Sequence, residues 1–224
     1  MPCPHNEITI VQRSQQQSAV AAAAYQSGEK LFCEYDQKVK HYPEKRGIVH
    51  NEILLPANAP PEYADRNTLW NAVEAVEKQW NPQLARRWVL TIPREIPPDQ
   101  YAVLVREFCQ QQFVSKGMCV DFAIHDKGDG NPHAHVMLTM RAMDEHGKWL
   151  PKSRKVYDLD ESGERIKLPS GRWKSHKGIR LTGTTRSIVK SGGMNGRSSR
   201  TAIWKPMTAR SVWTCVPMPD RGLI

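Results

Sequence analysis

Residues 118–140, "MCVDFAIHDKGDGNPHAHVMLTM", contain the strongest local folding signal in the chain. Two apolar runs flank the segment "DKGDGNP", whose Gly, Asp, Asn and Pro residues are typical of a turn between strands. Strands joined by so short a connection pair in antiparallel orientation. The stretch therefore predicts a β-hairpin, and it excludes a purely parallel sheet.

The residues before this hairpin alternate between strand-like and helix-like patterns. Strands are predicted at 8–13, 48–56 and 87–93, and helices at 18–28, 61–80 and 97–113. With the hairpin, the order is β-α-β-α-β-α-β-β. This order predicts an α+β fold, in which a central sheet of about five strands, antiparallel at least in part, carries helices mainly on one face.

Each predicted helix has its own signature. The first is rich in alanine, with Ser18 as N-cap and Gly28 to end it. The other two are amphipathic and begin near prolines. Their expected buried stripes are Leu69, Val73, Val76 and Trp80 in the second helix, and Tyr101, Leu104, Val105 and Phe108 in the third.

Composition narrows the class of protein. The five cysteines are widely spaced and form no C-x-x-C pair, which argues against a disulfide framework or a zinc ribbon. No apolar run is long enough to cross a bilayer, and the first ten residues do not resemble a signal peptide. We therefore expect a cytoplasmic protein without membrane insertion.

The net charge of +9 is concentrated at the carboxyl end. Residues 178–224 hold eight of the 32 Lys and Arg and one of the 23 Asp and Glu, which leaves a charge of only +2 on residues 1–177. The total charge therefore gives no evidence that the body of the chain binds nucleic acid.

Three histidines of the predicted hairpin form a candidate metal site. His133 and His135 lie on the same face of one strand, about 7 Å apart along the backbone. The turn brings His125 alongside, so three neutral nitrogens can bind a divalent ion and leave positions open for substrate. The alternative is that they only form hydrogen bonds around a polar turn.

Two weaker features accompany the histidines. Tyr25 lies near the end of the alanine-rich helix, whose small side chains let its backbone approach a sheet closely. Glu74 and Glu77 share a helix face, and one of them could hydrogen-bond a metal-bound histidine. On composition alone, Tyr25 is better explained as a partly buried aromatic at a helix end, and ordinary solvent exposure explains such glutamates in most helices.

Taken in this order, the three features resemble the MobA/MobL family of plasmid mobilisation relaxases, within the endonucleases that carry a histidine-hydrophobe-histidine motif. The resemblance covers roughly residues 6–177. Three stretches carry it, namely "SAVAAAAYQSGEKL" at 18–31, "LWNAVEAVEKQWNPQLARRWVLTIPRE" at 69–95 and "FAIHDKGDGNPHAHVMLTMR" at 122–141.

The resemblance implies a metal-dependent DNA endonuclease and strand transferase that nicks one strand at an origin of transfer. It makes Tyr25 the nucleophile, and it makes Glu74 or Glu77 the supporting carboxylate. The metal ligands would be His125, His133 and His135. The family usually works with magnesium or manganese, although three imidazoles also suit zinc, cobalt or nickel.

The resemblance further implies single-stranded origin DNA as the partner, with accessory mobilisation proteins and a coupling protein. Such DNA requires neutralisation of its backbone and aromatic surfaces for base stacking. Trp149 and Trp173 are candidate stacking residues. The candidate DNA-binding cations are Arg13, Lys30, Lys148, Lys152, Arg154 and Lys155.

These patterns divide the chain into a relaxase catalytic core at 1–146, a basic peripheral hairpin or arm at 147–177, and a tail at 178–224. The tail has one acid and no helical periodicity, and it departs abruptly from the family pattern. We therefore expect this tail to be translated out of frame and poorly ordered, so that the relaxase is C-terminally truncated. A basic, disordered DNA-binding tail is the alternative.

Three other functions share part of this evidence. A rolling-circle replication initiator uses the same chemistry, but its tyrosine commonly follows the histidine pair, whereas Tyr25 precedes it. A water-using metallohydrolase would leave Tyr25 a structural role. A non-catalytic DNA-binding remnant would occupy an origin without cleaving it.

Overall fold

The computed structural model describes residues 6–179, 202–207 and 212–217. Its centre is a five-stranded sheet in which every neighbouring pair is antiparallel. The spatial order is β1 (Asn6–Gln12), β5 (Gln83–Thr91), β7 (His133–Thr139), β6 (Val120–His125) and β4 (Ile48–Leu54). The predicted hairpin of residues 118–140 is confirmed as β6 and β7.

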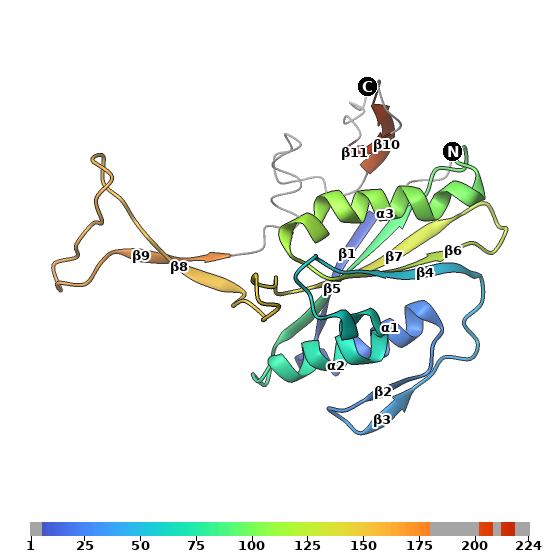
Figure 1. The fold of residues 1–224 in the computed structure, drawn as a ribbon, viewed down its shortest axis with the longest axis horizontal. Helices are drawn as coiled ribbons and strands as arrows, with labels where there is room; N and C mark the ends of the chain where they lie inside the picture. Colours follow the sequence, from blue (N-terminus) through green and yellow to red (C-terminus); the bar gives the residue numbers. More distant parts are fainter. Residues whose placement is uncertain (1–5, 180–201, 208–211, 218–224) are drawn as a thin grey trace, which may run out of the picture.

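Helices cover both faces of the sheet. Helices α1 (Ala19–Ser27) and α2 (Arg66–Val76) lie on one face, and α3 (Tyr101–Gln112) lies on the other (Figure 1). The α+β class is confirmed, with two of these three helices sharing one face. Short 3-10 helices are η1 (Arg13–Gln15), η2 (Pro61–Ala64), η3 (Pro98–Gln100) and η4 (Val114–Lys116).

Three further strand pairs lie outside the central sheet. They are β2 (Leu31–Cys33) with β3 (Lys38–Lys40), β8 (Ser153–Tyr157) with β9 (Ser175–Ile179), and β10 (Ala202–Met207) with β11 (Val212–Pro217). The β8–β9 ribbon projects away from the body of the molecule (Figure 1). Most of the predicted tail, at 180–201, 208–211 and 218–224, lies outside the described residues.

The core between α3 and the sheet is built from large side chains. Trp88 of β5, Phe108 of α3 and Phe113 just beyond that helix contact one another edge to face, with ring centroids 5.7 Å apart in each pair. Edge-to-face packing of this kind adds to the free energy gained from burial. This face of the sheet therefore serves stability rather than chemistry.

The core under α1 is built from small side chains. Ala19, Ala23 and Ala24 are fully buried, so the α1 backbone lies close to the sheet. The helix begins where the Ser18 side chain accepts from the amide of Ala21 and ends at Gly28, whose φ is +74°. The left-handed φ of Gly28 favours glycine, and a Cβ there would also lie 2.7 Å from Ile48 Cδ1, so the Ile48 side chain would have to shift.

A buried ion pair fastens α2 to the same face. Asp121 of β6 is fully buried and accepts two hydrogen bonds from the Arg66 guanidinium, at 2.9 and 3.0 Å. Trp70 Nε1 donates a third hydrogen bond to the carboxylate, at 2.8 Å. The charge on Asp121 is thus fully compensated, which buried charges require.

The sequence analysis predicted that the second helix extends to residue 80, but α2 ends earlier. Trp80 was expected on the buried stripe, but α2 ends at Val76 and Trp80 is 82% exposed. The backbone leaves the helical region at Glu77 (φ −94°, ψ 81°), because the chain must turn through Asn81 and Pro82 into β5. That placement of Trp80 was wrong.

In the described residues, no helix combines the length and apolar character needed to cross a bilayer.

Replacing Asp121 with asparagine should destabilise the protein by about 3 kcal/mol, because the buried Arg66 cation would lose its buried counter-charge and keep only the partly exposed carboxylate of Glu29. Urea unfolding followed by circular dichroism measures this change. The control is Asp99→Asn on an exposed turn, for which we expect less than about 1 kcal/mol. Equal stability of the two variants would contradict the prediction.

Candidate metal centre and tyrosine site

The three histidines converge at one end of the β6–β7 hairpin. His125 ends β6 and pairs with His133, which begins β7, while His135 pairs with Ala123. One ligand nitrogen from each histidine lies within 4.8 Å of the others. The ring centroids of His125 and His135 are 4.4 Å apart. The predicted convergence of these side chains on one point is therefore observed.

Main-chain carbonyls set the orientation of two rings. His125 Nε2 donates to the carbonyl of Gln26 at 2.8 Å, and His133 Nδ1 donates to the carbonyl of Asn131 at 2.8 Å. Because a carbonyl can only accept, each contact fixes the tautomer of its ring. The lone pairs of His125 Nδ1 and His133 Nε2 are thereby left for a ligand.

The electrostatics of the site suit metal binding. Burial is the main reason that the pKa of His125 is lowered to about 4 and that of His135 to about 3, and nearby positive charge, including that of Lys45, contributes to both values. Both imidazoles are therefore neutral at neutral pH, as metal ligands must be. His135 Nδ1 is buried without a hydrogen-bond partner among the described residues. This donor set fits a divalent ion.

Helix α1 brings Tyr25 to the edge of this site. Tyr25 is in the last turn of α1, and the carbonyl of the next residue, Gln26, accepts the hydrogen bond from His125. The Tyr25 side chain is 41% exposed. The Lys45 ammonium lies 4.1 Å from its ring centroid, and Tyr42 contacts it edge to face at 5.4 Å.

Glu74 caps α1 instead of contacting a histidine. Its Oε1 accepts from the Ser18 hydroxyl at 2.7 Å, from the Ala19 amide at 2.7 Å and from the Val20 amide at 3.3 Å. The carboxylate therefore binds the amide groups at the amino end of α1, where a negative charge is favourable. It fixes the helix that carries Tyr25.

Glu77 is also engaged elsewhere. It lies just beyond the end of α2 and forms ion pairs with Arg141 at 2.7 Å and with Lys152 at 2.8 Å. The described hydrogen bonds place neither glutamate against a histidine. The place expected for a carboxylate is taken by the carbonyls of Gln26 and Asn131, which side-chain patterns could not reveal.

The expected DNA-binding cations fall into two groups. Arg13 donates to the carbonyls of Glu77 and Glu74, and Lys152 pairs with Glu77, so both serve internal contacts. Lys30, Lys148 and Lys155 are exposed. The side chain of Arg154 lies outside the described residues.

The two tryptophans expected to stack on bases also differ. Trp149 is half-buried and stacks on Tyr63, with ring centroids 5.5 Å apart. Trp173 is 44% exposed near the β8–β9 ribbon, with the Lys167 ammonium 5.7 Å from its ring centroid. Trp173 is therefore the one of this pair with a face open to a ligand.

A model of the MobA/MobL family matches residues 17–208. The chain belongs to the MobA/MobL family. The match extends past Gly178, into the segment that the sequence analysis treats as out of frame. The catalytic residues expected from the family, Tyr25 and the three histidines, lie within the matched range.

Individual relatives agree with this assignment. The chain is 37% identical over 182 residues to "Conjugal transfer protein TraA" of Agrobacterium fabrum, covering 77% of this chain and 16% of that protein. It is 34% identical over 167 residues to "Probable mobilization protein MobA" of Bifidobacterium longum, covering 73% of this chain and 30% of that protein. The chain thus spans less than a third of the length of these MobA/MobL relatives.

A solved structure supports the fold. It is described as "Molecular Basis of Vancomycin Resistance Transfer in Staphylococcus aureus", and it matches with a TM-score of 0.64 and 34% identity. The match covers 68% of this chain and 77% of that chain. The MobA/MobL sequence assignment and the α+β architecture therefore agree.

The histidine site predicts a measurable affinity for divalent ions. His135→Ala should weaken binding of Mn²⁺ or Zn²⁺ at least about 100-fold, because loss of a ligand exceeds the 10- to 100-fold cost typical of outer-shell changes. Isothermal titration calorimetry at pH 7.5 measures the affinity. His146→Ala is the control, because that histidine is exposed and lies apart from the triad. A loss of affinity in the control alone would refute the site.

Glu74 should prove structural. Glu74→Ala should lower the free energy of unfolding by about 2 to 3 kcal/mol, because buried amides of α1 lose a charged acceptor. The exposed Glu107→Ala on α3 is the control. Glu74→Gln, whose amide oxygen still caps α1, should leave metal affinity within about threefold; a 10- to 100-fold loss would instead indicate direct support of a histidine.

Proposed function

We propose that this chain is the catalytic part of a plasmid mobilisation relaxase, which nicks one DNA strand at an origin of transfer. The proposal rests on the contact between the end of α1 and the end of β6. There the residue after Tyr25 is hydrogen-bonded to His125, so the helix that carries the phenol is joined to the strand end that carries the three-histidine site. Membership of the MobA/MobL family supports the same chemistry.

In the proposed reaction, the phenolic oxygen of Tyr25 attacks the phosphorus of one phosphodiester. A tyrosine O–P bond forms as the bond from phosphorus to the 3′-oxygen breaks. The phenol loses a proton and the 3′-oxygen gains one, so no water is consumed. The products are a 5′-phosphotyrosine linkage and a free 3′-hydroxyl, and the reverse reaction rejoins the strand.

His125, His133 and His135 would hold the divalent ion. When bound, such an ion neutralises charge on the non-bridging phosphate oxygens and orients the phosphodiester. Magnesium or manganese is the family expectation, whereas three neutral imidazoles also suit zinc, cobalt or nickel. The carbonyl of Gln26 keeps His125 in its ligating tautomer, and Glu74 keeps α1 in place beneath Tyr25.

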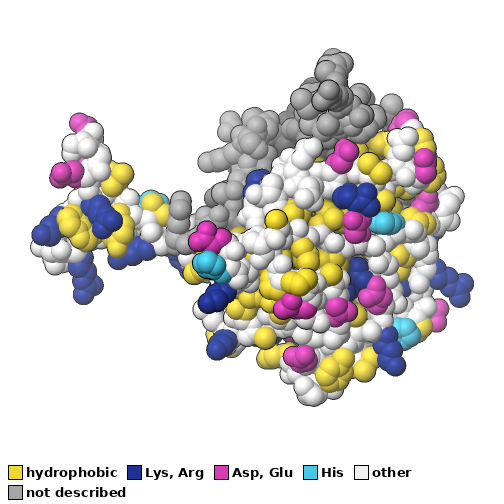
Figure 2. Space-filling model, in the orientation of Figure 1, with side chains coloured by type: hydrophobic (Ala, Val, Ile, Leu, Met, Phe, Trp, Pro, Cys, Tyr) yellow, Lys and Arg dark blue, Asp and Glu magenta, His cyan; other side chains and the backbone are white. Residues whose placement is uncertain are grey.

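The proposed substrate is single-stranded or locally melted DNA. Residues 153–177 hold seven Lys and Arg against four Asp and Glu, and Figure 2 shows basic and hydrophobic side chains together on this ribbon. We assign the ribbon to DNA contact, with Lys155 and Trp173 as the exposed candidates from the sequence. Accessory mobilisation proteins and a coupling protein are the expected further partners.

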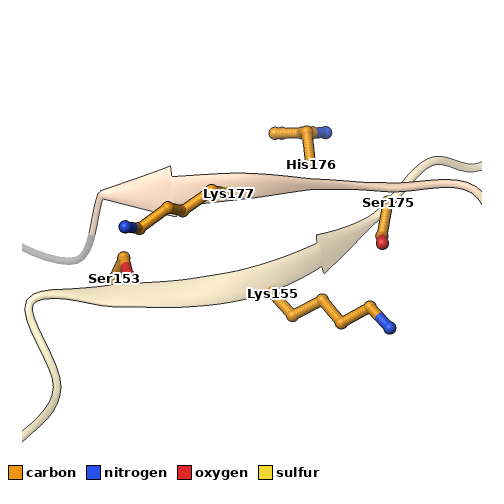
Figure 3. Close-up of a pocket in the computed structure, with 5 residues that line it drawn as sticks. All are labelled: Ser153, Lys155, Ser175, His176 and Lys177. Carbon is orange, nitrogen blue, oxygen red and sulfur yellow. The ribbon is translucent and has the colours of Figure 1, made fainter.

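A shallow pocket on the ribbon is consistent with contact to a polyanion. It is lined by Ser153, Lys155, Ser175, His176 and Lys177 (Figure 3). Lys155 and Lys177 extend from opposite strands, with their ammonium groups pointing away from each other (Figure 3). Positive charges spread along a ribbon in this way suit an extended phosphate backbone better than one compact anion.

Covalent capture tests the function. The protein is incubated with Mn²⁺ and single-stranded fragments of the replicon that encodes it, and adducts are resolved on a denaturing gel. We expect a protein–DNA adduct that is abolished in Tyr25→Phe and retained in Tyr35→Phe, an exposed tyrosine outside the histidine site.

The other outcomes identify the alternatives. Cleavage that persists in Tyr25→Phe would indicate a water-using metallohydrolase. Binding of the fragments without cleavage would indicate a non-catalytic DNA-binding protein. Sequencing of the captured DNA locates the nick, and a nick at the replication origin would indicate a rolling-circle initiator.

A further inference from the structure

We propose that Lys45 is a further functional residue of this site, which holds the Tyr25 ring in position and supplies positive charge beside the phosphodiester during nicking. The inference rests on the proposed function and deepens it. The sequence analysis did not single out Lys45, because a lysine in a polar loop is ordinarily a solvated surface residue.

The segment between β3 and β4 holds the Tyr25 ring from two directions. The Lys45 ammonium is 4.1 Å from the ring centroid, within the range of a cation–π interaction. Tyr42 of the same segment lies edge to face with the ring at 5.4 Å. A tyrosine that is 41% exposed would otherwise sample several rotamers. These contacts therefore restrict the phenol to one direction.

The same segment is tied to the histidine hairpin. The carbonyl of Gly47, two residues after Lys45, accepts from the amide of Asp126 at 2.8 Å, and Asp126 follows His125 directly. Gly47 has a φ of +80°, and a Cβ there would lie 2.8 Å from Lys127 Cγ. The loop therefore packs closely against the residues that follow the first ligand.

The charge of Lys45 reaches both parts of the site. It contacts the Tyr25 ring directly, and the loop that carries it is hydrogen-bonded through Gly47 to Asp126, the residue after His125. Within the described part of the chain, no carboxylate forms an ion pair with Lys45. The residue is half-exposed, so its ammonium remains available to an anionic substrate.

The reaction gives this charge a role. As the Tyr25 hydroxyl loses its proton, electron density rises on the oxygen and in the ring, and an ammonium over the ring face stabilises that density. Negative charge then spreads over the phosphate oxygens while the O–P bond to tyrosine forms and the bond to the 3′-oxygen breaks. A preorganised positive charge nearby favours this transition state over the resting state.

The test compares Lys45→Met with Lys45→Arg in the full chain. Single-turnover formation of the covalent adduct is followed with saturating single-stranded DNA from the capture experiment and Mn²⁺. We expect Lys45→Met to react about 10- to 100-fold more slowly, and Lys45→Arg to recover most of the rate. Lys116→Met removes an equal charge at the end of β6 away from His125, and should react like the unmodified protein.

A second measurement separates electrostatics from structure. Because Lys45 is a cation near the histidines, Lys45→Met should bind Mn²⁺ several-fold more tightly by calorimetry, whereas Lys45→Arg should match the unmodified protein. Slower nicking with tighter metal binding supports the inference. Thermal unfolding shows whether each variant remains folded.

Two results would overturn it. The first is an unchanged nicking rate in Lys45→Met, with the adduct still lost in Tyr25→Phe, which would leave the proposed function intact. The second is an equal loss of rate in the Met and Arg variants without any change in metal affinity, which would mean that the loop has only a structural role. Absence of an adduct from the unmodified protein would overturn the proposed function and the role of Lys45 together.

Discussion

The contact between the carboxyl end of α1 and strand β6 determines whether Tyr25 can act together with the histidines. The carbonyl of Gln26 accepts from His125, and the Gln26 side chain donates to the carbonyl of Asp121 at 3.1 Å. Both bonds require the helix backbone to lie close to the sheet, which the buried alanines of α1 allow. Gln26 thus joins the helix that carries the phenol to the strand that carries His125.

Three acidic residues of α2, its end and β6 are turned inward, and this arrangement shapes the electrostatics of the domain. Glu74 binds the amino end of α1, Glu77 pairs with Arg141, and Asp121 pairs with Arg66. Their negative charges are balanced by hydrogen bonds and ion pairs within the domain. What faces the histidine site instead is the positive charge of Lys45. Positive charge at this position attracts phosphodiesters.

The sequence predicted the features that depend on local periodicity. The hairpin, the three helices and the convergence of the histidines follow from alternation along strands and from a short turn. The structure added what depends on tertiary contacts. A main-chain carbonyl such as that of Gln26 has no side-chain signature, and the three-residue strands of β2 and β3 are too short for a periodic pattern. Trp80 matched the helical period, but α2 ended before reaching it.

The proposed ligands and the proposed nucleophile come from parts of the chain that assemble at different stages of folding. His125, His133 and His135 fall within eleven consecutive residues, whereas the hydrogen bond from His125 to Gln26 spans 99 positions. A hairpin closes within microseconds, but a contact of such separation must await the collapse of the whole domain. The histidine cluster can therefore form early, while Tyr25 joins it only in the finished fold. A newly made or partly unfolded chain would present the three histidines without the tyrosine beside them.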